Sequence, residues 1–167
     1  MDTTVKTGVW QQFGASIDML ADAMRACPDE LWTASLWNAP DEEAVYSQFW
    51  YCVYHTLVWL DLYLSGSSYD DFIPPAPFKR GVLPEQPYTK DQLRVYLEHG
   101  RRKCQSTIEA LTDERARQRC QYEWMDLSFF ELLLYTMRHV QEHGAQLHMF
   151  LGQHDITMND WISVAES

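Results

Sequence analysis

Two histidines one helical turn apart, His139 and His143, are the side chains of this sequence best placed to do chemistry. On a helix, a four-residue step rotates the side chain by only about 40°, so both rings lie in the middle of one apolar stripe. The stripe is formed by Leu132, Val140, Leu147 and Phe150. Each imidazole carries a donor and an acceptor that need partners there. A metal ion satisfies both rings at once, and helical zinc sites use this spacing. The alternative is a pair of core histidines bonded to tyrosines or carbonyls.

A third ligand is expected from another helix, and His55 is the best candidate. It lies near the midpoint of a predicted helix, as His139 does, so antiparallel neighbours would bring the two to the same level. The remaining histidines are worse placed: His99 falls opposite the Leu93/Leu97 stripe, and His148 falls on the far side of its helix from His139. Three histidines with open coordination positions are typical of a catalytic metal.

Four further side chains are candidates for a supporting or basic group at this site, namely Gln48, Tyr135, Glu142 and Gln146. Gln48 lies two helical turns before His55. The run HVQEH also fits the H-x-x-E-H pattern of inverzincin peptidases, in which Glu142 would be the general base. Glu142 is turned about 60° from His139 toward the polar flank, however, which favours an ordinary solvated acid.

Four helices are expected to carry these residues. The first spans about Thr7 to Met24. The second begins near Asp41, with Asp41 as N-cap and Glu42 and Glu43 in the first turn, and ends at Ser65 and Gly66. This second helix is apolar nearly all round, so it is either central or shared with a partner chain, and a homodimer is expected.

A proline-rich segment separates the second helix from the third. Residues 73–88 hold five prolines and cannot form a helix or a central strand. Their length is enough to cross the whole bundle, so helices two and three would run parallel. Helix three begins after Thr89 with Gln92 completing a capping box. Helix four begins after Ser128 with Glu131 and runs to Leu151. No useful period-two alternation was found, so we predict an all-α, up-down-down-up four-helix bundle forming one domain over residues 1–167.

Composition excludes several functions. The chain has 24 acidic and 13 basic side chains, a net charge of −11, which argues against nucleic-acid binding and against docking on an anionic membrane. No uninterrupted apolar run is long enough to span a bilayer. The first ten residues lack signal-peptide features, and the four cysteines are scattered, so we expect reduced thiols in a cytoplasmic protein. A catalytic cysteine is the less favoured alternative to buried thiols.

The segments FWYCVYHTLVWLDLYLSG and YTMRHVQEHGAQLHMFLGQ resemble the metal-binding helices of the DinB/YfiT-like superfamily. That family is a four-helix bundle in which one histidine of helix two and a His-x3-His pair of helix four hold a divalent metal. The resemblance implies that His55, His139 and His143 are the ligands. Characterised relatives include transferases and isomerases that depend on the thiols bacillithiol or mycothiol, and the family gives no reason to expect DNA binding.

These observations predict one divalent metal ion per chain, zinc or nickel first, bound by His55, His139 and His143. An enzyme of this kind would activate a thiol or a water, making it a thiol transferase or a hydrolase acting on a small molecule. The alternative is a non-catalytic, dimeric metal-binding or stress-response module.

Overall fold

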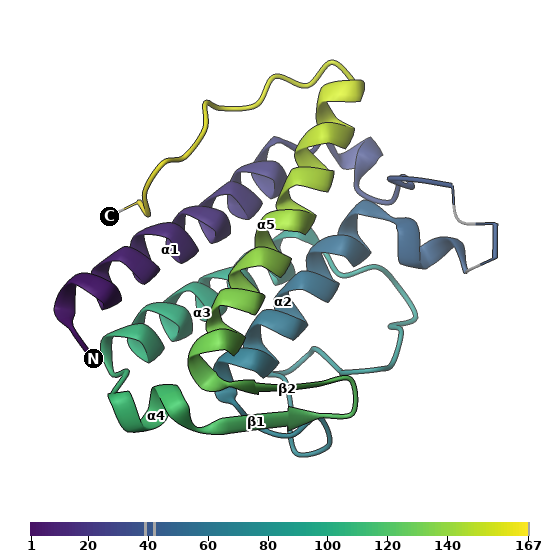
Figure 1. Cartoon of the computed structure of the whole chain (residues 1–167). Coiled ribbons are helices and arrows are strands. Elements are labelled where there is room, and N and C mark those ends of the chain that lie inside the picture. The colour runs from purple at the N-terminus through teal and green to yellow at the C-terminus, as the bar shows by residue number, and fades with distance from the viewer. Residues whose placement is uncertain (39, 42, 167) are drawn as a thin grey trace.

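Four long helices packed side by side form the body of the protein in the computed structural model, which describes residues 1–38, 40–41 and 43–166 (Figure 1). They are α1 (Thr3–Ala26), α2 (Phe49–Ser65), α3 (Lys90–Glu109) and α5 (Phe129–Gln153). Helices α1 and α2 each pack against both α3 and α5. The expected helical fold class is therefore confirmed, with the small additions described below.

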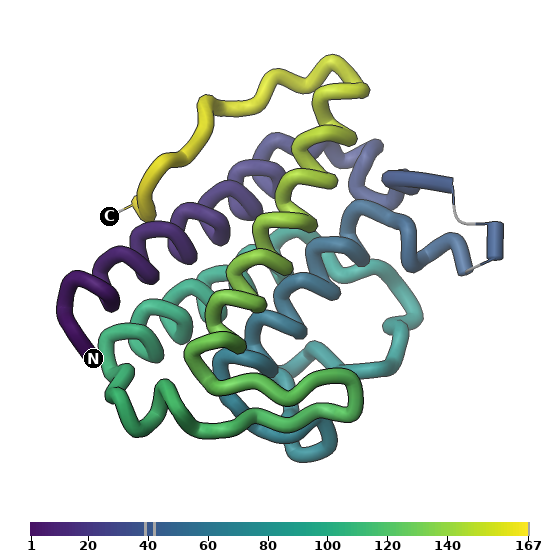
Figure 2. Tube along the Cα trace, viewed as in Figure 1, coloured from purple at the N-terminus to yellow at the C-terminus, as the bar shows by residue number. Residues whose placement is uncertain are grey.

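Contacts along the helices fix their relative directions. Near the start of α2, the Tyr54 ring lies 5.0 Å from that of Tyr88, just before α3, and further along Asp61 binds Lys103. Helices α2 and α3 thus run the same way, and the tube in Figure 2 shows that residues 66–89, which connect them, return along the outside of the bundle beside α2. In contrast, Phe49 meets Phe150 and Tyr63 meets Tyr135, so α2 and α5 run in opposite directions.

The helix ends agree with the predicted capping residues in three places. Thr89 with Gln92 and Ser128 with Glu131 form complete capping boxes before α3 and α5. Gly66 ends α2 with φ of 64°, in the left-handed region that favours glycine. The side chains of the two capping boxes and the backbone amide of Gly66 satisfy groups that a helix leaves unpaired at its ends.

The predicted start of α2 near Asp41 is wrong. Helix α2 begins at Phe49, after a short 3-10 helix over Ala44–Ser47, and Glu42 lies outside the described residues. The reason is that the backbone here pairs with an earlier segment: Leu36 donates to the Ser47 carbonyl at 2.7 Å, and Phe49 donates to the Ala34 carbonyl at 3.0 Å. Those bonds hold Gln48 extended, with ψ of 149°, which prevents the helix from extending backwards.

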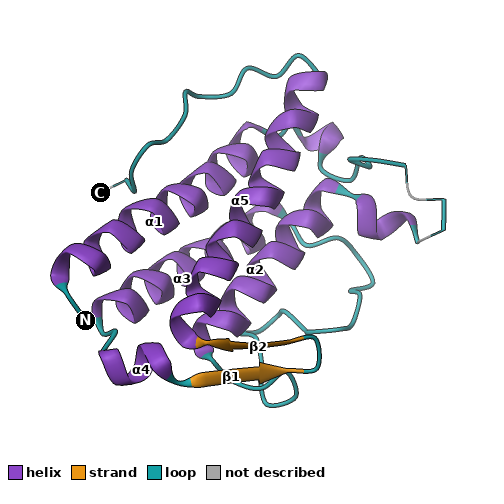
Figure 3. Ribbon diagram, viewed as in Figure 1, coloured by secondary structure: helices purple, strands orange, loops and turns teal. Residues whose placement is uncertain are grey.

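A helical turn and a β-hairpin connect α3 to α5, and the expectation of no strand was wrong here (Figure 3). The turn is α4 (Asp113–Arg117), and the strands are β1 (Arg119–Tyr122) and β2 (Met125–Ser128), paired antiparallel with Arg119 opposite Ser128. Each strand has only four residues, too few for an alternating pattern to stand out.

Burial within one chain explains the apolar character of α2. Most of its side chains are buried between α3, α5 and the returning segment, where Phe78 stacks on Tyr54 at 6.3 Å and the Tyr54 hydroxyl donates to the Lys79 carbonyl. The composition of α2 therefore requires no partner chain, and the homodimer stays a prediction. Among the described residues, no helix is both long and apolar enough to cross a membrane.

After α5 the chain returns along α1 (Figure 1). The Ala165 amide donates to the Gln11 carbonyl at 2.9 Å, and the Glu166 amide donates to Asp18 at 2.7 Å. Arg101 of α3 also binds Asp18 at 2.7 Å, so this buried carboxylate joins three parts of the chain. The C-terminal segment thus closes the side of the bundle formed by α1 and α3.

Candidate metal centre

Helices α2 and α5 bring His55, His139 and His143 together. The His139 Nε2 atom lies 3.2 Å from Nε2 of His55 and 3.1 Å from Nε2 of His143. One ring nitrogen from each residue falls within 4.8 Å of the others, and all three side chains are half-buried. The pair on α5 lies at the margin of the buried face rather than in its middle, because Val140, Gly144 and Leu147 fill the core side.

The spacing of these nitrogens fits a shared metal ion. Imidazole nitrogens bind zinc at about 2.0–2.1 Å, which separates two ligands of one ion by about 2.9–3.4 Å for angles between octahedral and tetrahedral. The observed 3.1 and 3.2 Å lie in that range. Each neutral Nε2 offers either one proton or one lone pair, so the lone pairs of all three rings can face a single point only if a cation lies there.

Gln146 favours one tautomer of His143. Its Oε1 lies 2.8 Å from His143 Nδ1, and because an amide oxygen only accepts, Nδ1 must carry the proton. The lone pair of His143 is then on Nε2, the atom that faces the other two histidines. Partners of this kind fix the ring orientation and tautomer of metal-binding histidines. Gln146, a candidate from the sequence, thus contacts the site directly.

Burial keeps the other two rings neutral. It lowers the pKa of His55 to about 4 and that of His139 to about 3, and the neighbouring imidazoles add to both shifts. Both rings therefore offer lone pairs at neutral pH, as metal ligation requires. The Nδ1 atom of His139 is buried without a hydrogen-bond partner in the described part of the chain, which leaves Nε2 as that ring's polar contact.

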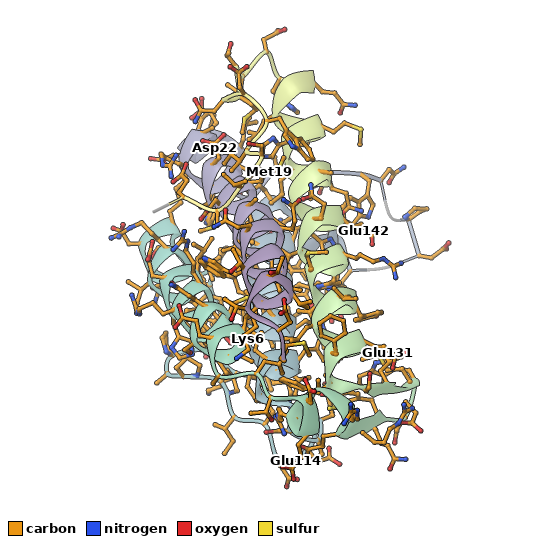
Figure 4. The ribbon with its side chains drawn as sticks, turned by 60° about the vertical axis from the view of Figure 1, so that its left-hand side comes forward. Lys6, Met19, Asp22, Glu114, Glu131 and Glu142 are labelled. Carbon is orange, nitrogen blue, oxygen red and sulfur yellow. The ribbon has the colours of Figure 1, made fainter. Side chains whose placement is uncertain are left out.

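The remaining candidates from the sequence, apart from Tyr135, lie outside the histidine cluster. His99 Nε2 lies 3.5 Å from Asp61, and His148 Nε2 donates to the Met19 carbonyl of α1 at 2.9 Å, so both are outside the cluster. Gln48 was a poor candidate, since its Oε1 accepts from the Trp50 indole at 2.6 Å. Glu142 is exposed on α5, as expected of a solvated acid and not of a peptidase base (Figure 4).

A pocket of about 500 Å³ opens beside His55 and His139. This is within the range of small-molecule sites. Its other walls are aromatic: Trp59, Tyr63, Tyr69, Trp124 and Tyr135. Of these, the sequence had singled out only Tyr135. Trp59 follows His55 by one helical turn and could have been found by spacing, but Tyr69 lies in a loop and Trp124 at the tip of the hairpin, where periodicity gives no signal.

The four cysteines offer no nucleophile. All are free and buried, and burial raises the pKa of Cys27 and Cys52 to about 12 and also raises those of Cys104 and Cys120. They therefore remain protonated thiols at neutral pH, whereas a reactive cysteine needs a lowered pKa. The Sγ atom of Cys52 lies within hydrogen-bond distance of His143 Nδ1, at 3.6 Å.

Together, the fold and the site define a helical-bundle protein in which two facing helices bring three imidazoles together beside a pocket. Helical bundles build metal sites in this way, from side chains on facing helices. A family model described as the DinB superfamily matches residues 12–147, and the chain belongs to this superfamily. The matched stretch contains all three histidines. No curated protein matches the chain.

Proposed function

We propose that this protein binds one divalent metal ion through His55, His139 and His143 and uses it to activate a thiol for transfer to a small electrophilic substrate. The observation that carries the proposal is the convergence of three Nε2 atoms, 3.1 and 3.2 Å apart, at the wall of a pocket. Imidazole ligands suit zinc and nickel alike. Three protein ligands would leave coordination positions for a substrate.

When bound, a divalent metal lowers the pKa of a thiol or water that it coordinates. The lining of the pocket favours the thiol. A general base that takes a proton from water assists metal-dependent hydrolysis, and no carboxylate lines this pocket among the described residues. A thiol starts from a pKa near 8.5 and needs little further help to ionise.

The chain's own residues would bind and shield the substrate. Trp59, Tyr69 and Trp124 form mutual ring contacts of 5.5 to 5.8 Å and provide an apolar wall. Such a wall excludes water from the reacting groups. Tyr63 and Tyr135 line the same pocket, and burial raises the pKa of Tyr63, so that its hydroxyl stays protonated.

Metal content tests the first part of the proposal. The purified protein should bind about one zinc or nickel ion per chain, and His139→Ala should reduce occupancy sharply because it removes the central nitrogen of the cluster. His148→Ala is the matched control on the same helix and should change nothing, since His148 bonds to Met19. Full occupancy in the triple alanine variant of His55, His139 and His143 would refute the site.

A thiol titration of the cobalt-substituted protein tests the second part. A low-molecular-weight thiol should change the cobalt spectrum and allow conjugation of chlorodinitrobenzene. The thiol sulfur forms a bond to the ring carbon, chloride leaves, and the thiol proton passes to solvent. Both effects should disappear in His139→Ala. Spectral silence with a range of thiols would contradict the transferase and favour a hydrolase or a non-catalytic module.

A further inference from the structure

Arg80 is a cation without an acidic partner beside the metal centre. It lies in the returning segment between α2 and α3 and is half-buried, with its guanidinium carbon 3.7 Å from the centre of the Tyr69 ring. Its Nη1 atom is buried and has no hydrogen-bond partner in the described residues. Acidic side chains outnumber basic ones by 24 to 13, yet no carboxylate of the described residues forms an ion pair with Arg80.

Other semi-buried cations of the protein have hydrogen-bond acceptors, and several of them bind carboxylates. Arg101 binds Asp18 at 2.7 Å, and Lys103 binds Asp61 at 2.5 Å. A buried guanidinium N–H group without an acceptor is costly, so the unpaired Nη1 atom of Arg80 is a feature that calls for an explanation. The Tyr69 ring holds the group in place by a cation–π contact but accepts no conventional hydrogen bond.

Arg80 lines a second pocket, of about 250 Å³, that adjoins the first. The two pockets share His55, Trp59 and Tyr69. The second is otherwise walled by Tyr51, Tyr54, Val58 and Leu62. A ligand that extends across these three shared side chains would lie near His55 at one end and near the Arg80 guanidinium at the other, with aromatic and aliphatic side chains along it.

We propose that the natural ligand of this site is a small organic carboxylate with a flat apolar body, and that Arg80 binds its carboxylate. The planar fork of arginine matches the two oxygens of a carboxylate, and tyrosine and tryptophan walls favour a flat apolar body. This inference rests on the proposed function for the other end of the ligand, which lies at the metal centre. It adds a charge requirement that the three histidines do not impose.

Calorimetry with phenylacetate and its neutral amide, phenylacetamide, tests the inference, because the two probes share a shape and differ in charge. Zinc-loaded protein should bind phenylacetate more tightly than the amide. Arg80→Gln should weaken phenylacetate binding by about 10- to 100-fold and leave amide binding and zinc content unchanged. Arg80→Lys keeps the positive charge but loses the planar guanidinium group, so its affinity for phenylacetate should lie between those of the wild-type protein and Arg80→Gln. Arg94→Gln is the matched control, an exposed arginine of α3.

The same titration on chelated protein separates this inference from the proposed function. Arg80-dependent binding of phenylacetate to a protein that takes up no zinc would refute the metal centre alone. Three results would overturn the role of Arg80 alone in a protein that takes up zinc. These are equal binding of phenylacetate and its amide, equal binding of phenylacetate to Arg80→Gln and to the wild-type protein, and no binding of phenylacetate. Circular dichroism of each variant checks that the bundle is intact.

Discussion

The contact between Gln146 and His143 decides which nitrogen of that imidazole is free to bind a metal. A metal-binding histidine held in this way loses 10- to 100-fold in affinity when its partner is removed. We therefore expect Gln146→Ala to weaken zinc binding by about 10-fold, measured by competition with a chelating dye. Gln141→Ala is the control, because Gln141 lies on the same helix and contacts Met19 at 3.8 Å. Equal affinity in both variants would show that the tautomer is not set by Gln146.

The neutral, half-buried histidines also make the metal-free protein sensitive to acid. The pKa is about 4 for His55 and about 3 for His139, against about 6.5 in an unfolded chain. The unfolded state therefore binds more protons as the pH falls through 6.5, and the free energy of unfolding decreases. Between about pH 7 and about pH 5 the chelated protein should lose up to about 2 kcal/mol for each of the two histidines.

Substitution separates this effect from general acid denaturation. In His139→Phe, the decrease in the free energy of unfolding between pH 7 and pH 5 should be smaller by about 2 kcal/mol, because one of the two imidazoles is absent. His154→Ala, an exposed histidine after α5, should retain the full loss. Denaturant unfolding of chelated protein at both pH values measures this. An unchanged pH dependence in His139→Phe would mean that the ring is not held neutral by burial.

At the scale of the elements, patterns predicted the parts of the fold that depend on local sequence. Capping residues such as Thr89 and Ser128 located the starts of α3 and α5 because their side chains bind backbone groups three residues away. The start of α2 was missed because distant residues, Ala34 and Leu36, bind its backbone. The site divides in the same way: helical spacing found His139 and His143, whereas Arg80 and Trp124 lie in a loop and a hairpin tip that no period predicts.

The end of α2 offers a prediction about an element boundary. Gly66 has a φ of 64°, and an added Cβ would lie 2.7 Å from Nη2 of Arg115 and 3.1 Å from the Phe129 ring. Gly66→Ala should therefore lower the free energy of unfolding by about 1–3 kcal/mol. Gly8→Ala is the matched control, because Gly8 lies within α1 with nothing within 4 Å of an added Cβ. That change should stabilise the protein by about 0.5–1 kcal/mol.

Thermal unfolding distinguishes the two glycines. For a chain of this size, 1 kcal/mol corresponds to roughly 2–4 °C, so the two variants should melt on opposite sides of the wild-type protein. A Gly66→Ala variant as stable as wild type would mean that the end of α2 rearranges without cost. Loss of stability in Gly8→Ala would contradict the helical, uncrowded position of that residue.

On the scale of the whole molecule, the core does not depend on the three histidines. The largest fully buried side chains lie on all four long helices and include Phe13, Trp50, Tyr96 and Phe129, whereas the histidines are half-buried at the margin of that core. A chain of this length buries about 70% of its unfolded surface, which is enough for a domain to fold without a metal. Small structural zinc domains, by contrast, unfold when the ion is removed.

We therefore expect chelation to leave the bundle folded. Helical circular dichroism at 25 °C should be unchanged, and cooperative melting should shift downward, because a ligand present at about 100 times its Kd contributes about 2.7 kcal/mol of stability. That shift corresponds to roughly 5–10 °C for a chain of this size. In His139→Ala, chelation should produce almost no shift, since little metal is bound to remove. Loss of helicity on chelation of the wild-type protein would show that the metal holds the fold together, and would remove the main argument for an open, reactive centre.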